Sequence, residues 1–316
     1  MVKVCLCLTI PTVRVKICVA TNEMHFSVRF IWNALFVFEE DEKMRKVIKK
    51  ILSLLIVVLL FVSIFNIDGL SYIFLKASAS TEYTEGKYIY TITDGEATIV
   101  GTTDQLIGYV SIPDMLGGCK VTAIGDAAFK NSYNITSVRI GDNVKVIGSE
   151  AFSGGCYQIS NVTIGKNVTT IGSSAFRYCS ALKYITIPDN VTSIGGFAFS
   201  SCSSLESVSI GNGVTYIGAN AFSSCAKLTR ITIPENVSQI GDYAFGGCSK
   251  LENITVDENN KNYSNDENGV LFNKDKSLLI KYPEAKSGEV YVIPLTVTTV
   301  STRAFDNCNN LKSITI

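Results

Sequence analysis

The sequence predicts a repeat solenoid, mostly β, with short helical or 3₁₀ turns between its strands. Two observations lead to this fold class: an Ala-Phe dipeptide recurs along the chain, and short runs of alternating apolar and polar residues recur with it. Most of the spacings between successive phenylalanines are 23 or 24 residues, with a longer gap before the last copy. A fixed period of this length is typical of repeat architectures, in which each unit buries its apolar face against the next. The recurring positions are Phe129, Phe152, Phe176, Phe199, Phe222, Phe245 and Phe305.

Each unit contains two segments with the pattern of a short strand. Residues 182–187 read Leu-Lys-Tyr-Ile-Thr-Ile, and this alternation with β-branched side chains predicts a strand with one buried face. Residues 191–194 predict a second, shorter strand. Gly195 follows it and predicts a bend, because glycine adopts backbone angles that other residues avoid. The Ala-Phe-x-x-Cys-x-x-Leu segment then has apolar residues three and four apart, which predicts one helical or 3₁₀ turn.

The N-terminal part of the chain has the layout of an export signal. A basic stretch covers residues 44–50, an uncharged apolar run covers 51–65, and Ala77-Ser78-Ala79 supplies small residues that suit a signal peptidase. Residues 44–79 are therefore predicted to be a signal peptide. The alternative is an uncleaved membrane anchor built on a 51–75 helix, since about 20 apolar residues can span a bilayer. Either way, residues 80–316 are expected outside the cytoplasm, because the basic cluster stays inside.

Residues 1–43 do not fit ahead of such a signal. They show no stable periodicity, and Met44 stands directly at the start of the basic stretch. We therefore expect residues 1–43 to be an incorrectly assigned or unstructured N-terminal extension, with translation starting at Met44. A cytoplasmic tail is the alternative.

The repeated residues resemble the BspA-like leucine-rich repeats, a bacterial class with a 23-residue unit. The resemblance runs from about Tyr88 to Ile316. The segment Tyr90–Ile99 resembles the capping hairpin of that family. This resemblance implies a leucine-rich-repeat stack over residues 110–316, with an N-terminal capping hairpin over residues 80–109.

The long gap before Phe305 also resembles the family. Residues near 257–294 are expected to form a hairpin insertion, whose two strands flank residues 273–276. The last unit stops on the strand pattern of residues 313–316. Because an unpaired strand edge is an aggregation hazard, we expect a truncated reading frame or a fragment of a longer protein.

Cysteines recur with the repeat. Zinc ligands normally come as close pairs such as Cys-x-x-Cys, and no such pair occurs. Stacked units bring equivalent Cα atoms to roughly 5 Å, which is within disulfide reach. Because every unit offers the same position, no pairing is favoured, and we expect a column of buried thiols acting as small hydrophobes. Disulfides remain the alternative. The equivalent cysteines are Cys156, Cys179, Cys202, Cys225, Cys248 and Cys308.

Two columns of hydroxyl side chains follow the two predicted strands. Threonine suits an exposed strand position, but such a column could also line a face for protein or glycan contact. Aromatic and arginine side chains are the usual hot-spot types of interfaces, and three of them stand on the longer strands. The predicted binding residues, expected on a concave face, are Arg139, Tyr184, Thr186, Arg230 and Thr232. The second column consists of Thr122, Thr169, Thr192, Thr215, Ser238 and Thr298.

Chemistry beyond binding has little support. From residue 80 onward the chain holds 18 Lys and Arg against 22 Asp and Glu and no histidine, so neither nucleic-acid binding nor histidine acid–base catalysis is indicated. No cofactor or metal is expected.

The acidic residues near 257–260 and 266–267 could offer oxygen ligands to calcium, but a solvated turn is favoured. Three Asn-Val-Thr triplets, at Asn161, Asn167 and Asn190, match the glycosylation pattern, although asparagine also suits the turn there.

The family resemblance implies secretion or cell-surface display and a role in adhesion or protein recognition. We expect an exported, non-enzymatic protein that binds an extracellular protein or glycan ligand, with membrane contact only through an uncleaved 51–75 helix. The alternatives are a structural spacer within a larger cell-surface protein and a cell-wall or glycan-acting enzyme.

Overall fold

The computed structural model describes residues 4–10, 13–21, 73–78 and 81–316, and it divides the chain into two compact units, 1–80 and 81–316. In the first unit, β1 (Val4–Ile10), β2 (Val13–Thr21) and β3 (Ile73–Ser78) form an antiparallel sheet in that order. Strands here were not expected from the sequence. The basic stretch and the apolar run of residues 44–65 lie outside the described residues, so the signal or anchor remains a prediction. None of the described segments is a helix able to cross a bilayer.

The second unit opens with the expected hairpin. The strands β4 (Glu82–Glu85), β5 (Tyr88–Thr93) and β6 (Glu96–Thr102) form an antiparallel meander. Asp94 and Gly95, which join β5 to β6, have φ values of 52° and 77°. Two positive φ angles in a two-residue loop are the signature of a tight hairpin turn. β6 then pairs in parallel with β9 (Cys119–Ile124), so the hairpin caps the first coil of the stack.

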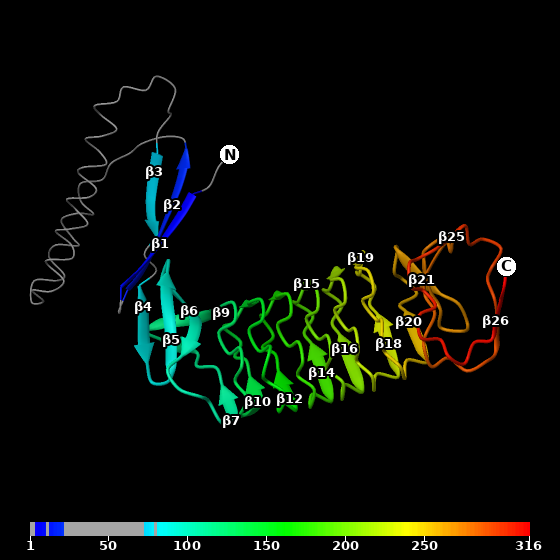
Figure 1. Cartoon of the computed structure of the whole chain (residues 1–316), viewed down its shortest axis with the longest axis horizontal. Coiled ribbons are helices and arrows are strands. Elements are labelled where there is room, and N and C mark those ends of the chain that lie inside the picture. The colour runs from blue at the N-terminus through cyan, green and yellow to red at the C-terminus, as the bar shows by residue number, and fades with distance from the viewer. Residues whose placement is uncertain (1–3, 11–12, 22–72, 79–80) are drawn as a thin grey trace, which may run out of the picture. The chain divides into compact units, whose positions relative to one another are not determined.

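Two ribbons of parallel strands run along the stack (Figure 1). The long-strand ribbon comes in three hydrogen-bonded pieces: β7 (Gly108–Ser111), β10 (Ile135–Arg139) and β12 (Asn161–Thr163); β14 (Tyr184–Ile187) and β16 (Ser207–Ile210); β18 (Arg230–Ile233) and β20 (Asn253–Val256). The short-strand ribbon continues from β9 through β11 (Val146–Ile147), β13 (Thr170–Ile171), β15 (Ser193–Ile194), β17 (Tyr216–Ile217) and β19 (Gln239–Ile240).

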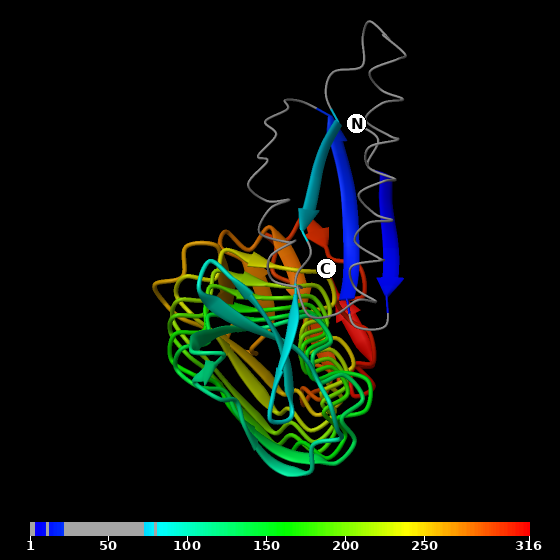
Figure 2. The same cartoon turned by 90° about the vertical axis from the view of Figure 1, so that its left-hand side faces the viewer.

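The strand register confirms the repeat. Thr170 pairs with Ser193, and Ser193 pairs with Tyr216, so neighbouring coils are offset by one 23-residue unit. Seen nearly end-on, the coils lie behind one another (Figure 2). They enclose a single continuous core that reaches from the capping hairpin to β20 and includes Leu271.

The recurring phenylalanines form the centre of this core. Five successive pairs, from Phe129 to Phe245, stack with ring centroids 4.9–6.1 Å apart and planes within 13° of parallel. The rings of these six residues are at most 2% exposed. Their spacing is close to the distance between hydrogen-bonded strands, so the backbone pitch of the ribbons sets the distance between rings.

The turn segment after each short strand is not helical, and no helix occurs among the described residues. The expectation of helical or 3₁₀ turns was therefore wrong. Residues two before and two after each phenylalanine have positive φ, for example Ser174 (56°) and Tyr178 (66°) around Phe176, and a helix cannot pass through such angles. Alternate amides donate to the next coil instead: the Phe176 amide bonds the Ala198 carbonyl at 2.8 Å.

Gly195 also has a different role from the expected one. Its φ lies outside the left-handed region, but a Cβ there would come within 2.5 Å of the Ser173 backbone nitrogen. The equivalent glycines 172, 218 and 241 approach the preceding coil in the same way. Glycine is needed at this corner because two backbones nearly touch, and not because the chain bends sharply.

The region of the predicted insertion contains more strands than one hairpin. β21 (Tyr263–Asn265), β22 (Leu271–Asn273) and β23 (Leu278–Lys281) form an antiparallel meander, and β25 (Thr299–Val300) joins β23 in parallel. A further parallel pair consists of β24 (Val290–Val292) and β26 (Ser313–Thr315), while β8 (Met115–Leu116) is a short partner of β9. A second, smaller core lies beneath these C-terminal strands.

Replacing Phe199 by Ala is expected to lower the free energy of unfolding by about 3 to 5 kcal/mol, because it leaves a cavity between two stacked rings. Chemical denaturation of the purified chain measures this change. Phe197→Ala is the matched control in the same turn, since Phe197 is 37% exposed and should change stability little. Equal losses in the two variants would contradict a core held together by the phenylalanine column.

Candidate binding surface

The outer face of the long-strand ribbon carries two columns of outward-facing side chains, most of them exposed. In the first column Ser137 aligns with Asn161, Tyr184 with Ser207, and Arg230 with Asn253. The second column holds Ser111, Arg139, Thr163, Thr186, Ser209, Thr232 and Thr255. Between the three hydrogen-bonded pieces, the 23-residue repeat carries the alignment forward. Because inward-facing residues alternate with these positions, the columns present polar atoms outward while the same strands close the core.

All five predicted site residues lie on this ribbon and are exposed. Tyr184 and Arg230 share one column, two strands apart, which is roughly 10 Å. Thr186 and Thr232 lie beside them in the second column. Arg139 lies in the second column, between Ser111 and Thr163, and not in the column of Tyr184 and Arg230. Their placement on a concave face remains a prediction.

Sequence reasoning missed the part that Glu206 has in this surface. The Tyr184 hydroxyl donates a 2.9 Å hydrogen bond to a carboxylate oxygen of Glu206, from the next coil. This hydrogen bond raises the pKa of Tyr184. It also holds the phenol, which is 60% exposed, over the strand face. The repeat pattern could have indicated this contact. Glu206 directly follows the repeated leucine position and directly precedes Ser207, which pairs with Tyr184.

The two hydroxyl columns differ in what their oxygens do. On the short-strand ribbon, the hydroxyls of Thr169, Thr192, Thr215 and Ser238 each donate to a backbone carbonyl of the preceding coil, at 3.1–3.2 Å. On the long-strand ribbon, Thr255 bonds the neighbouring Asn253 at 2.9 Å. The hydroxyls of Thr163, Thr186, Ser209 and Thr232 form no hydrogen bond within residues 81–316. The hydroxyl column beside the short strands is therefore structural, whereas these four hydroxyls of the long-strand ribbon have donors and acceptors left for a ligand.

The glycosylation-like asparagines belong to a similar ladder. The side-chain amide of Asn190 donates to the Lys166 carbonyl at 2.8 Å, and that of Asn167 donates to the Asp142 carbonyl at 2.8 Å. Asn143 and Asn236 make the same contact in their own coils. Asn161 differs, because it lies exposed on β12. Asn167 and Asn190 thus recur because their side chains join the turns of neighbouring coils.

The cysteine column is buried. The thiols of Cys156, Cys179, Cys202, Cys225 and Cys248 each donate to the carbonyl of the phenylalanine in the preceding coil, at 3.2–3.5 Å. The cysteines of residues 81–316 are all free. Burial raises the pKa of Cys156 to about 11 and that of Cys202 to about 12. Protonated thiols are poor nucleophiles and poor metal ligands, so this column acts as a set of small hydrophobes.

The acidic residues near the insertion are used in its turns. One oxygen of Asp266 accepts the Val270 amide at 2.9 Å, and the other accepts the Tyr291 hydroxyl at 2.8 Å. Asp257 accepts the Asn259 amide at 2.9 Å. In the part of the chain that is described, no three His, Cys, Asp or Glu side chains come together as metal ligands. These contacts favour the solvated-turn interpretation over a calcium site.

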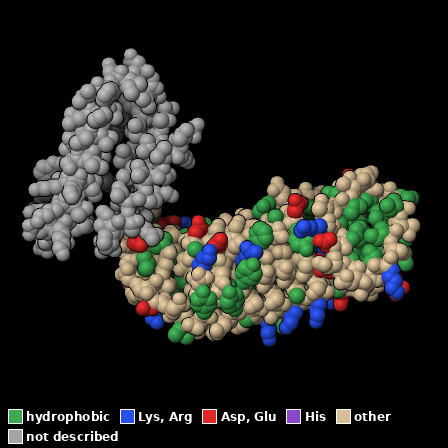
Figure 3. Space-filling model, in the orientation of Figure 1, with side chains coloured by type: hydrophobic (Ala, Val, Ile, Leu, Met, Phe, Trp, Pro, Cys, Tyr) green, Lys and Arg blue, Asp and Glu red, His purple; other side chains and the backbone are tan. Residues whose placement is uncertain are grey.

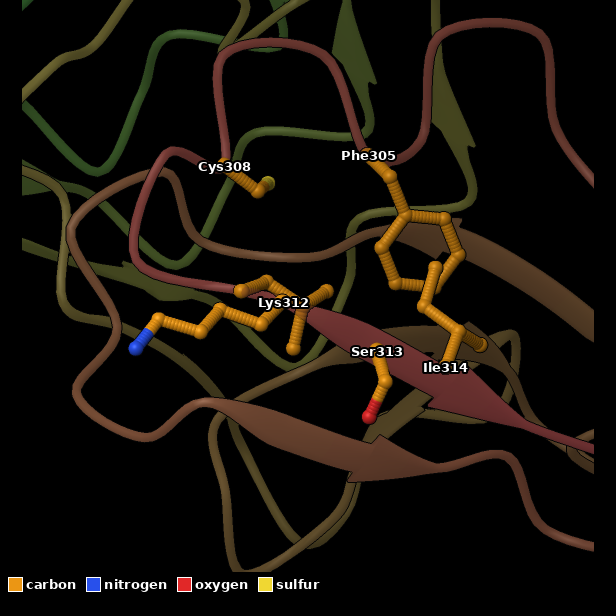
Figure 4. A pocket seen from close by; sticks show the side chains of 6 residues that line it. Phe305, Cys308, Lys312, Ser313 and Ile314 are labelled. Atoms are coloured by element: carbon orange, nitrogen blue, oxygen red, sulfur yellow. The ribbon is translucent and has the colours of Figure 1, made fainter.

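A hollow of about 290 Å³ lies beside β26 and is lined by Phe305, Cys308, Leu311, Lys312, Ser313 and Ile314. Phe305 and Ile314 face it, while the Lys312 amino group points away (Figure 4). Lys312 pairs with Glu289 at 2.5 Å, and burial raises the pKa of Cys308 to about 11. The lining therefore offers apolar contact and no activated nucleophile at neutral pH.

The model of the BspA type leucine-rich repeat region family matches the chain with six copies, over residues 109–210, 169–267 and 284–316. No curated protein matches. Among solved structures, a leucine-rich cell surface protein from Faecalibacterium prausnitzii is 32% identical, with a TM-score of 0.57, and the match covers 74% of this chain and 76% of that one.

Two further solved structures are similar. A leucine-rich repeat protein from Bacteroides ovatus is 26% identical with a TM-score of 0.51, and the pneumococcal vaccine antigen PcpA is 22% identical with a TM-score of 0.65. Each match covers 74% of this chain and 64% of the other, and the likeness to PcpA concerns the fold alone.

The Asn190→Ala variant is expected to lose about 1 kcal/mol of stability, because it removes one inter-coil hydrogen bond and leaves the Lys166 carbonyl without that donor. Urea denaturation gives the value. Asn161→Ala, in a triplet of identical sequence, is the control and should be near neutral. A neutral result for Asn190 would contradict the ladder.

Stability should fall as the pH rises above about 8.5, because the unfolded chain ionises its thiols there while the buried thiols stay protonated. The contribution of the buried thiols to the free energy of unfolding is complete below the thiol pKa of the unfolded chain, and it is lost progressively toward pH 11 to 12. Urea midpoints under reducing conditions at pH 7.5 and pH 10 measure the decline. In Cys202→Ala the decline should be smaller, by about 1.4 kcal/mol per pH unit in this window. The same decline in both proteins would refute the thiol origin.

Proposed function

Because the chain belongs to the BspA-type leucine-rich repeat family, we propose that it is displayed outside the cell and binds an extracellular protein through its long-strand ribbon. Export is supported by the basic, apolar and small-residue segments of residues 44–79. It is also supported by the likeness to a cell surface protein from Faecalibacterium prausnitzii.

One observation supports the ribbon as the binding face: the hydroxyls of Thr163, Thr186, Ser209 and Thr232 form no hydrogen bond within residues 81–316, whereas those beside the short strands bond the backbone. These exposed hydroxyls bond water in the free protein and can exchange it for hydrogen bonds to a partner, with a modest net gain. Tyr184 and Arg230 add the large planar side chains that carry most of the energy in protein interfaces. Glu206 holds the Tyr184 ring in place, so less side-chain entropy is lost on binding.

A protein partner fits this face better than a nucleic acid. From residue 80 onward acidic residues outnumber basic ones, so the electrostatic attraction that nucleic acid requires is missing. The regular spacing of the strands suits an extended protein surface that meets several coils at once.

Binding of the full chain to immobilised extracellular matrix proteins and to a glycan array tests the proposal. Saturable binding to a protein ligand is expected. Tyr184→Ala and Arg230→Ala should each weaken that binding at least tenfold, which corresponds to about 1.4 kcal/mol. Tyr216→Ala is the matched control, because Tyr216 is 38% exposed on the short-strand ribbon. No saturable binding, or equal loss with Tyr216→Ala, would overturn the proposal.

A further inference from the structure

An arginine stacked on two aromatic rings lies on the turn face, which we define as the outer surface of the turn segments that follow the short strands. The Arg177 guanidinium carbon is 4.7 Å from the centre of the Tyr178 ring and 4.9 Å from that of Phe197. Phe197 comes from the next coil, so the cluster bridges two turns. A nitrogen of Arg177 also donates to the Tyr178 hydroxyl at 3.1 Å. The cluster of Arg177, Tyr178 and Phe197 is named the arginine stack below.

The charge of the arginine stack is not neutralised within the described residues. Arg177 has no carboxylate partner there, and its buried Nε has no hydrogen-bond acceptor. The neighbouring charges on this face, Lys130 and Glu150, pair with each other. Since aromatic rings cover the guanidinium face, its N–H edge is the part left to bond. That edge matches a planar carboxylate in a bidentate hydrogen bond.

Both aromatic residues of the arginine stack stand at strained positions. Tyr178 has a φ of 66° and Phe197 a φ of 58°, in the left-handed region that disfavours bulky side chains. Every coil has positive φ at these two places, and the residue types there vary, from Asn220 and Gly154 to Glu150 and Tyr243. Tyr178 and Phe197 are 41% and 37% exposed, so they add little to the core in return. Both rings therefore have exposed faces beside the guanidinium that a ligand can contact.

More aromatic side chains lie on the preceding turns. The rings of Tyr133 and Tyr157 are 6.4 Å apart and about half exposed. Gly155 makes room for this pair, because a Cβ there would come within 2.4 Å of the Tyr133 ring. On the face in Figure 3, hydrophobic and charged side chains gather in a row along the stack.

We infer that the arginine stack is a second binding site, separate from the long-strand ribbon, for a protein segment that presents an Asp or Glu carboxylate beside an apolar side chain. The carboxylate bonds the N–H edge of Arg177, and the apolar side chain packs on the exposed rings of Phe197 and the tyrosines. Exposed Tyr and Arg side chains that are already held by stacking are the usual anchors of such contacts. The single unpaired cation is too little for a nucleic acid or a membrane surface, which need clusters of basic residues.

A random dodecapeptide phage library provides the probe. The full chain is used for selection, and Arg177→Met is used for counter-selection. Enriched peptides are expected to share an acidic residue next to an aromatic or aliphatic one. The best peptide, labelled with fluorescein, should bind the chain with saturable anisotropy. Changing its acidic residue to the amide should weaken binding at least tenfold.

Three variants separate this site from a structural role. Arg177→Lys keeps the charge but loses the planar fork, so it should fold normally and lose affinity at least tenfold. Phe197→Asn introduces the residue found at the equivalent position 220, where asparagine adopts positive φ more easily. This variant should have a higher thermal midpoint and should bind the peptide more weakly. Tyr184→Ala, on the ribbon, should leave peptide binding unchanged.

The opposite results would overturn the inference. The inference fails if no peptide is enriched against Arg177→Met, or if the acidic and amide peptides bind with equal affinity. It also fails if Phe197→Asn binds the peptide as tightly as the unchanged chain, or if only Tyr184→Ala loses binding. The last result would support the ribbon instead. Conversely, failure of the long-strand ribbon to bind matrix proteins would not change what the peptide experiment says about the arginine stack.

Discussion

The close approach of backbones at one corner of each coil is the constraint on which the rest of the structure depends. At Gly218 and Gly241 any side chain would lie within 2.4 Å of the preceding coil's backbone, so the coils stack at the pitch of hydrogen-bonded strands. That pitch puts every repeat position directly above its equivalent. The phenylalanine stack, the thiol column and the asparagine ladder are results of this single spacing, because each needs its partner one coil away.

The capping hairpin and the insertion were expected from the family resemblance, whereas periodicity was sufficient to predict the solenoid and the two strands of each unit. It failed at the turn segments. Apolar residues at three- and four-residue steps look helical, but the amides of Ser174, Phe176 and Tyr178 bond the next coil and not their own turn. A single unit read in isolation cannot reveal a hydrogen bond that exists only between units. The role of Gly195 was misjudged for the same reason.

The candidate surfaces were predictable only in part. Exposure of Tyr184 and Arg230 followed from strand alternation. The difference between the two hydroxyl columns did not, because identical residue types bond the backbone on one ribbon and not on the other. Arg177 and Phe197 were also overlooked. Their signal is a departure from the repeat, since the equivalents of Arg177 in the next two coils are buried serines that bond each other. In a repeat protein, the conserved positions describe the scaffold and the exceptions describe recognition.

The thiol column has a consequence for biogenesis. A chain that enters an oxidising space unfolded exposes every one of its evenly spaced cysteines, and any two neighbours can join. In the folded column the thiols are buried and each sulfur bonds a carbonyl within 3.5 Å, so oxidants in solution reach them far less easily than in the unfolded chain. For a chain exported as proposed, the stacking of adjacent coils therefore competes with oxidation of the exposed thiols.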